Sequence, residues 1–328
     1  MPEKLEFHNI YGTLTRPDAG LILYRVAQPA REALNHVAFE RSKTPSGAEL
    51  RFIPHGEVTI TLERLVGGWD PTHSLLEVWF GDQPCALHVL PTGRSSFSVR
   101  IPENAAFWQA RARGLFDPSL ARVLLPIDTE THLIAVSGDF EPPISGQAPA
   151  RRLLSYGSSI TCGGAVLPSE TYPMLLAKAL GRDCLNFGFP GGARLEPELA
   201  VWMASLEWDV ATLELGINVI DLWDAEVFAA RAHEFIRIMA ATGRWVFCTD
   251  LYTSYLDAAP NSKLEAYRTA VRDAVRSLNS SRCVYVPGNS LLDWSGLSID
   301  ALHPSAAGMQ QLAAKWWAMI APKLESNG

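Results

Sequence analysis

Residues 153–161 read LLSYGSSIT, a short apolar run that passes directly into a glycine and a pair of serines. Apolar runs of this kind recur along the second half of the chain, at 152–156, 183–187, 210–215, 244–249 and 283–287. The segments between them carry apolar residues at helical spacing, as between 261 and 278. Strands that are apolar almost throughout and alternate with helices indicate a parallel sheet covered on both faces. The sequence therefore predicts an α/β domain of three layers over residues 150–328.

The first 140 residues have a different texture. Short segments alternate apolar and polar positions between turn residues, at 20–26, 57–62, 75–80, 97–101 and 133–136. Period-two alternation with frequent turns predicts an antiparallel β-sandwich, jelly-roll-like, with one solvated face. The proline- and glycine-rich stretch 141–149 is typical of a linker. We expect two domains, 1–145 and 150–328.

Composition excludes several classes of protein. The chain has 328 residues, 48% apolar and 19% charged, with a net charge of −7. These values fit a folded protein and disfavour nucleic acid or an anionic membrane as a partner. No apolar stretch approaches the roughly 20 residues of a membrane span. The polar start and five scattered cysteines favour a reducing, cytoplasmic location. No Cys/His cluster with zinc spacing and no phosphate-binding glycine motif occurs, so we expect neither metal nor cofactor.

Two short segments carry groups that can do chemistry. Ser159 follows the apolar run at 152–156, and Asp300 precedes His303 by three residues near the other end of the chain. A serine hydroxyl becomes a useful nucleophile when a base takes its proton, and a third group improves that base by fixing its tautomer. Gly191 and Asn218 also follow predicted strands. Since active sites of open parallel sheets form at the carboxyl ends of the strands, we expect these residues to share one edge.

Each residue also has a plainer reading. Asp300 could cap the helix predicted to begin near Ser305. Asn218 could be a loop residue that bonds to its own backbone. Ser158 is a rival nucleophile beside Ser159, and because neighbouring side chains at a strand end point in opposite directions, only one of the two serines can meet His303.

Four blocks, taken in order, resemble the SGNH (GDSL-type) hydrolase superfamily. They are Gly157-Ser158-Ser159-Ile160-Thr161, Asn186-Phe187-Gly188-Phe189-Pro190-Gly191-Gly192, Glu214-Leu215-Gly216-Ile217-Asn218 and Asp300-Ala301-Leu302-His303-Pro304. The resemblance covers about 150–320 and implies a flavodoxin-like α/β/α hydrolase domain. A sandwich placed before such a domain is similar to certain carbohydrate acetyl esterases and related acyltransferases.

The resemblance implies a role for each matched position. Ser159 corresponds to the nucleophile, His303 to the general base and Asp300 to the carboxylate that holds it. The backbone N–H groups of Ser159 and Gly191 and the side-chain amide of Asn218 correspond to the oxyanion hole.

Two departures bear on the subfamily. The family usually has aspartate where this chain has Ser158, and often aspartate where it has Val219. Neither position has a catalytic role in the resemblance. The two departures therefore leave the subfamily, and with it the substrate, undetermined.

The expected function is a serine esterase for small acyl esters, such as acetyl on a carbohydrate or related alcohol. An acyltransferase using the same Ser-His-Asp site is the alternative. A third reading is a carbohydrate-binding protein whose hydrolase site is inactive. The expected partner is a small-molecule or carbohydrate ester, and assembly into a homo-oligomer is allowed.

Overall fold

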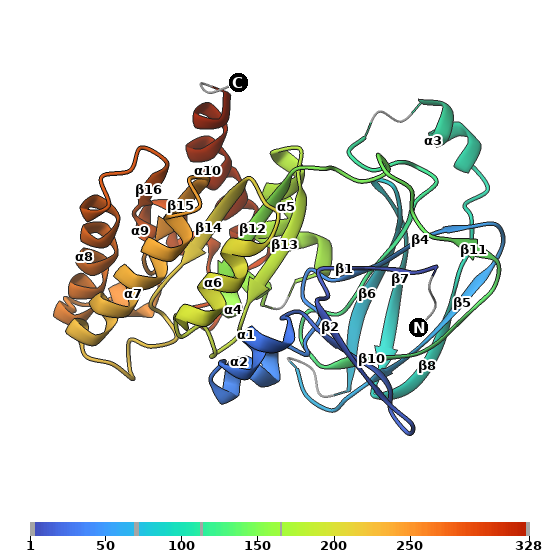
Figure 1. Ribbon diagram of the computed structural model, residues 1–328, viewed down its shortest axis with the longest axis horizontal. Coiled ribbons are helices and arrows are strands. Elements are labelled where there is room, and N and C mark those ends of the chain that lie inside the picture. The colour runs from blue at the N-terminus through green and yellow to red at the C-terminus, as the bar shows by residue number, and fades with distance from the viewer. Residues whose placement is uncertain (1–3, 69–71, 112–113, 165, 326–328) are drawn as a thin grey trace.

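The structure is a computed structural model that describes residues 4–68, 72–111, 114–164 and 166–325. Its described strands form three sheets, two of them antiparallel and one parallel. Figure 1 shows the antiparallel sheets together at one end of the molecule and the parallel sheet, flanked by helices, at the other.

The parallel sheet is built from the five apolar runs of the second half. Its strands lie in the order β13-β12-β14-β15-β16. Their bounds are β12 Arg152–Gly157, β13 Asp183–Gly188, β14 Val210–Glu214, β15 Trp245–Thr249 and β16 Cys283–Val286. This is the 2-1-3-4-5 order of flavodoxin-like sheets, in which the order of the parallel strands reverses beside the first strand. The predicted α/β/α fold is confirmed.

Helices cover both faces of this sheet because successive strand residues point to opposite sides. Leu154 faces a core shared with α6, α7 and α8, whereas its neighbour Leu153 faces a core shared with α5 and α10. The helix bounds are α5 Tyr172–Ala179, α6 Pro197–Ser205, α7 Ala225–Ala240, α8 Ser262–Ser277 and α10 Ala306–Glu325. Burial on both faces explains why the strands read as apolar throughout.

The first part of the chain forms the predicted antiparallel sandwich. One sheet runs β1-β4-β9-β6-β7, with β11 added beside β4, and the other runs β2-β3-β10-β5-β8. Alternate residues of both sheets, such as Ile60, Leu62, Leu76 and Val78, fill one buried core. The bounds are β1 Glu6–His8, β2 Gly12–Arg16, β3 Gly20–Tyr24, β4 Glu49–Pro54, β5 Val58–Arg64, β6 His73–Phe80, β7 Gln83–Pro91, β8 Gly93–Val99, β9 Ala121–Leu124, β10 Thr131–Ser137 and β11 Phe140–Glu141.

Two short helices early in the chain depart from the all-strand expectation for this part. Helices α1 (Gln28–Glu32) and α2 (His36–Arg41) follow β3 and pack against the second half of the molecule. Figure 1 shows both beside α4 (Ser159–Cys162) and α6, away from the sandwich core. A later helix, α3 (Ala105–Arg111), lies at the outer end of the sandwich.

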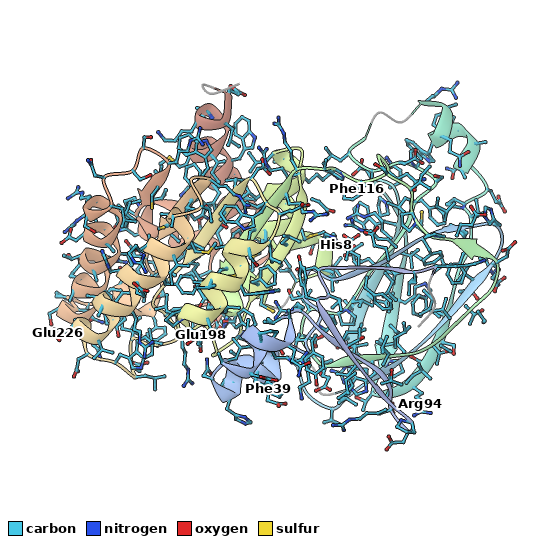
Figure 2. All side chains as sticks on the ribbon, in the orientation of Figure 1. His8, Phe39, Arg94, Phe116, Glu198 and Glu226 are labelled. Atoms are coloured by element: carbon cyan, nitrogen blue, oxygen red, sulfur yellow. The ribbon has the colours of Figure 1, made fainter. Side chains whose placement is uncertain are left out.

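A buried ionic network joins the sandwich to the parallel sheet. Arg51 on β4 donates to both oxygens of Asp183 on β13, at 2.7 and 2.8 Å, and to Glu49 at 2.7 Å. Arg122 donates to the same Glu49. Burial opposes ionisation of Asp183 and Glu49, but the arginines outweigh it and lower the pKa of both carboxyls. His8, labelled in Figure 2 at the border between the two parts, donates from Nε2 to the Cys184 carbonyl at 2.7 Å.

The chain passes from one part to the other between β11 and β12. We propose that the two domains, 1–145 and 150–328, divide in this segment. Among the described residues, no helix combines the length and the apolar character that crossing a lipid bilayer requires.

Candidate active site

The Gly157-Ser158-Ser159 turn leads from β12 into the short helix α4 (Ser159–Cys162). Ser158 caps this helix by accepting a hydrogen bond from the N–H of Ile160 at 3.1 Å. Gly157 is required by close approach, because a Cβ there would lie 2.2 Å from Thr161 Oγ1 and 2.3 Å from Glu214 Oε2. The turn therefore holds Ser159 at the carboxyl edge of the sheet, as the strand-end rule predicts.

The structure brings Ser159, His303 and Asp300 together. Ser159 Oγ lies 2.7 Å from His303 Nε2, and His303 Nδ1 lies 2.6 Å from Asp300 Oδ2. These distances form one continuous chain of hydrogen bonds from hydroxyl to carboxylate. An imidazole that donates from Nδ1 to a carboxylate has an unprotonated Nε2, which can accept the serine proton.

Local backbone geometry holds Asp300 in this position. Its Oδ1 accepts hydrogen bonds from the N–H groups of Leu302 and His303, both at 2.9 Å, and from the Ser298 hydroxyl at 2.8 Å. Partial burial works against ionisation, but the bonds from His303, Leu302 and Ser298 prevail and lower the pKa of Asp300. The cap that α10 needs comes from Ser305, whose hydroxyl accepts from the Gly308 N–H at 3.2 Å. Asp300 is therefore not needed as the cap of α10, and its Oδ2 accepts from His303.

The structure turns Ser158 away from His303. Its hydroxyl donates to Glu214 Oε1 at 2.7 Å, and its N–H donates to Glu214 Oε2 at 2.8 Å. The Thr161 hydroxyl donates to the same Oε2 at 2.8 Å. Burial raises the pKa of the Glu214 carboxyl, and the bonds from Ser158 and Thr161 offset only part of that rise. Glu214, at the end of β14, therefore fastens both sides of the Ser159 turn.

Glu214 is a positioning residue whose role the sequence did not reveal. Glu214→Ala leaves the buried Ser158 N–H without its acceptor, so the turn shifts and kcat for phenyl acetate falls by about 10- to 100-fold, the scale expected for a 1 Å misplacement. KM changes little because Glu214 is buried beneath the pocket. Glu214→Gln keeps an acceptor oxygen and recovers most of kcat.

Steady-state kinetics and a urea unfolding curve on wild type and both variants measure this. A loss of stability in Glu214→Ala with an unaltered kcat would contradict the positioning role.

The three groups assigned to the oxyanion hole lie near one another. Ser159 and Gly191 line the same pocket, and Asn218 Oδ1 accepts from the N–H of Ala193 at 3.1 Å. That bond directs the Asn218 amide toward the loop that carries Gly191. Within the described residues, no hydrogen bond uses the Ser159 N–H, the Gly191 N–H or the Asn218 side-chain NH₂. Three such donors suit a developing oxyanion.

Gly191 has the left-handed φ of +69° that glycine tolerates, and it is exposed at the pocket. The pocket has a volume of about 430 Å³ and walls from both parts of the chain. Its lining residues are Val37, Arg41, Gly68, Ile127, Asp128, Ser159, Pro190, Gly191 and His303. Sequence reasoning missed the first five of these, which lie far from the four motif blocks.

Three residues within or beside the motif blocks have no place in this chemistry. Cys162 is buried, its thiol donates to the Ile127 carbonyl, and burial raises the pKa of that thiol. Tyr156 and Phe189 are core residues with no exposed surface. Over the described part of the chain, no three His, Cys, Asp or Glu side chains are grouped as metal ligands.

Comparison with known proteins relates part of this chain to a sequence family and the whole chain to solved structures. The sequence model of the GDSL-like lipase/acylhydrolase family matches residues 155–311. A search of curated proteins finds no match. Among solved structures, the chain is similar to the salicylyl-acyltransferase SsfX3 from a tetracycline biosynthetic pathway, with a TM-score of 0.78 and 20% identity over 98% of this chain and 95% of that one.

Two further structures show the same two-part architecture. A GDSL-like lipase from Bacteroides ovatus has a TM-score of 0.73 and 15% identity, with 98% of each chain covered. An acetyl xylan esterase from the rumen bacterium Butyrivibrio proteoclasticus has a TM-score of 0.57 and 14% identity over 99% of this chain and 96% of that one. At such identities the likeness establishes the fold. Residues 155–311 thus match the GDSL-like lipase/acylhydrolase family, and the whole chain shares the two-part fold of these structures.

Proposed function

We propose that this protein is a serine esterase that hydrolyses small acyl esters through an acyl-enzyme on Ser159. The match of residues 155–311 to the acylhydrolase family supports a carboxylic-ester hydrolase. The observation that carries the residue assignment is the hydrogen-bonded chain from Ser159 Oγ through His303 to Asp300, with spacings of 2.7 and 2.6 Å.

The first half-reaction forms the acyl-enzyme. Ser159 Oγ attacks the ester carbonyl carbon while His303 Nε2 takes the hydroxyl proton, and Asp300 stabilises the imidazolium that results. The carbonyl oxygen becomes an oxyanion that faces the N–H groups of Ser159 and Gly191 and the amide of Asn218. The bond from carbon to the leaving alcohol then breaks, and His303 returns the proton to that alcohol.

Water completes the cycle by the same steps. A water molecule enters beside His303 and gives it a proton as its oxygen attacks the acyl carbon. The second tetrahedral intermediate collapses, the bond to Ser159 Oγ breaks and His303 reprotonates the serine. The products are the carboxylic acid and the free enzyme, so atoms and charges balance.

The dimensions of the pocket favour a small acyl group. Its volume of about 430 Å³ lies at the low end of the range for small-molecule sites. An acetyl group or a short functionalised acyl chain fits this space together with part of its alcohol. A carbohydrate acetate is therefore a suitable substrate, in keeping with the acetyl xylan esterase among the structural neighbours.

Intact-protein mass spectrometry tests the covalent step. The protein is mixed with 4-nitrophenyl acetate and quenched in acid within the first turnovers, and the expected result is one added acetyl group, located at Ser159 by peptide mapping. Turnover of the ester with an acyl group on no residue, or on a residue other than Ser159, would overturn the proposal.

An acyltransferase is the second candidate, favoured by the 98% coverage of this chain by the fold of the salicylyl-acyltransferase. The acyl-enzyme is common to both activities, so only its acceptor distinguishes them. Products are therefore measured with and without added alcohols and sugars. A transferase gives the new ester in excess over the acid at millimolar acceptor, whereas an esterase gives mainly acid.

The remaining features of the proposal concern setting and partners. We propose a cytoplasmic enzyme, supported by five free cysteines of which four are buried. The net charge of −7 supports a neutral or small charged substrate over nucleic acid. We also propose that the protein assembles into a homo-oligomer, whose molar mass in solution light scattering measures.

A further inference from the structure

The active-site pocket is completed by the first part of the chain. Ser159, Gly191 and His303 form its chemical side, while helix α2 supplies Val37 and Arg41 to another wall. The pocket thus has a side that the four motif blocks do not determine. This side faces the reacting ester and can discriminate among substrates.

Arg41 is the positively charged residue of that wall. It is half-buried, and within the described residues its guanidinium makes no hydrogen bond or ion pair. Its backbone carbonyl accepts from Arg25 and from the Thr44 N–H at 3.1 Å, and the side chain takes part in neither bond. A guanidinium carries five donors in a planar fork, and those of Arg41, which lines the pocket, are not among the buried atoms without a partner, so a ligand can reach them.

The other charged groups of the pocket already have partners. Asp128 accepts a hydrogen bond from the Ser74 hydroxyl at 2.7 Å and lies 3.8 Å from the Arg64 guanidinium. His303 is held by Asp300. Arg41 is therefore the one lining charge without a counter-charge among the described residues, and its sign is positive.

Helix α2 is held rigidly against the catalytic loop at its carboxyl end. The fully buried Arg25 donates to the Arg41 carbonyl at 3.0 Å and to the Gly188 carbonyl at 2.8 Å. The same side chain donates to the Asn186 carbonyl at 2.8 Å, so one guanidinium joins the end of α2 to the end of β13. The backbone of Arg41 is itself held by this contact.

The amino end of α2 is fixed to the same loop. Asn35 caps the helix and donates to the Gly192 carbonyl at 2.9 Å. Gly192 has no room for a side chain, since a Cβ would lie 2.7 Å from the Ala38 N–H nitrogen. Figure 2 labels Phe39 of this helix at the junction between the sandwich and the parallel-sheet part of the molecule. Hydrogen bonds thus hold both ends of α2 against the loop that contains Gly191. Arg41 is therefore in position before a substrate binds.

We infer that Arg41 selects esters that carry a carboxylate close to the scissile bond, on either the acyl or the alcohol side. The inference rests on the proposed esterase function and names its substrate class. A carboxylate matches the guanidinium fork through two parallel hydrogen bonds and supplies the missing counter-charge. The bond that Ser159 attacks remains the ester, and the carboxylate takes no part in the covalent steps.

Matched pairs of esters test this selection. For the acyl side the pair is 4-nitrophenyl hemisuccinate and its methyl ester, and for the alcohol side it is 4-acetoxybenzoate and its methyl ester. In each pair the two members differ in charge at nearly the same size. The measured quantity is kcat/KM of the anionic ester divided by kcat/KM of the neutral one, for wild type, Arg41→Gln and Arg41→Lys.

The control variant is Arg16→Gln, which removes one positive charge from an exposed position on β2. In one of the two pairs, wild type and Arg16→Gln prefer the anionic ester. Arg41→Gln lowers that ratio by about 10- to 100-fold, the factor that a charge-assisted hydrogen bond contributes. Arg41→Lys retains part of the preference because it keeps the charge but loses the fork. The responding pair identifies the side of the ester that carries the carboxylate.

Three outcomes would overturn the inference. Wild type could show no preference for the anionic member of either pair while hydrolysing the neutral members, in which case the esterase function stands and the selection fails. Arg41→Gln could lower kcat/KM for both members of a pair equally, which would assign Arg41 to transition-state stabilisation in general. Failure to hydrolyse all four esters, with no acyl-enzyme formed, would overturn the proposed function and this inference with it.

Discussion

Ser159→Ala is expected to lower kcat for phenyl acetate by about 10⁴- to 10⁶-fold, the range found when a triad serine is removed. The reason is that Ser159 Oγ is the hydroxyl hydrogen-bonded to His303 Nε2, at 2.7 Å, so the substitution removes the group that this base would deprotonate. The oxyanion hole would survive, so a residual rate above that of water is expected.

Ser158→Ala is the matched comparison, because it removes the same atom from the adjacent residue. Ser158 Oγ serves Glu214 and caps α4, so its loss disturbs the turn and costs no more than about 100-fold in kcat. Purified proteins are compared by initial rates and by labelling with a fluorophosphonate probe. Wild-type turnover or labelling by Ser159→Ala would exclude Ser159 as the nucleophile, and the reverse order of the two variants would assign Ser158 instead.

The parallel-sheet half could be predicted because its signals are local. Each strand is a short apolar run buried on both faces, and each helix carries its own apolar stripe, as Leu264, Tyr267 and Val271 do on α8. The strand-end rule then gathers Ser159, Gly191 and Asn218 at one edge without reference to distant contacts. Asp300 and His303 are three residues apart, so their pairing is also local.

The residues that the sequence did not reveal depend on contacts between distant segments. Arg41 reaches the pocket because α2 packs on the Gly191 loop, and no periodicity in residues 28–41 encodes that contact. Arg25 and Glu214 did leave a signal, since each is a charged residue inside an apolar strand-like run. A charge in such a position is buried at a cost unless other groups satisfy it, and in both cases those groups surround Ser159 or Gly191.

The sandwich contributes to the site because it is attached rigidly to the parallel-sheet part of the chain. Arg51 and Asp183 pair in a fully buried bidentate contact, and Glu77 accepts from the N–H and hydroxyl of Ser169 at 2.8 and 2.9 Å. Breaking such buried pairs is costly, so the two parts of the chain hold a fixed relation. A wall such as Arg41 can therefore be positioned by one part for chemistry performed in the other.

Asp300→Asn is expected to lower kcat for phenyl acetate by about 10³- to 10⁴-fold while leaving the fold intact. The asparagine oxygen can keep accepting from the N–H groups of Leu302 and His303 and from the Ser298 hydroxyl, so the loop retains its anchors. Its NH₂ group then faces His303 Nδ1 and can only donate. The imidazole must accept there and carry its proton on Nε2, which turns the base toward Ser159 into a donor.

The expected loss of kcat comes mainly from the changed tautomer of His303 and less from the lost negative charge of Asp300. The Asp300 side chain is 44% exposed, so water screens its attraction for the imidazolium. The control is Asp293→Asn, a similarly exposed carboxylate that pairs with Lys315 at 3.0 Å outside the site, and it is expected to keep wild-type kcat. The rates of ester hydrolysis and of fluorophosphonate labelling fall together in Asp300→Asn, because both reactions need the Ser159 proton removed. The thermal unfolding midpoint of Asp300→Asn stays close to that of Asp293→Asn. An Asp300→Asn variant within tenfold of wild type would mean that a group other than Asp300 sets the state of His303.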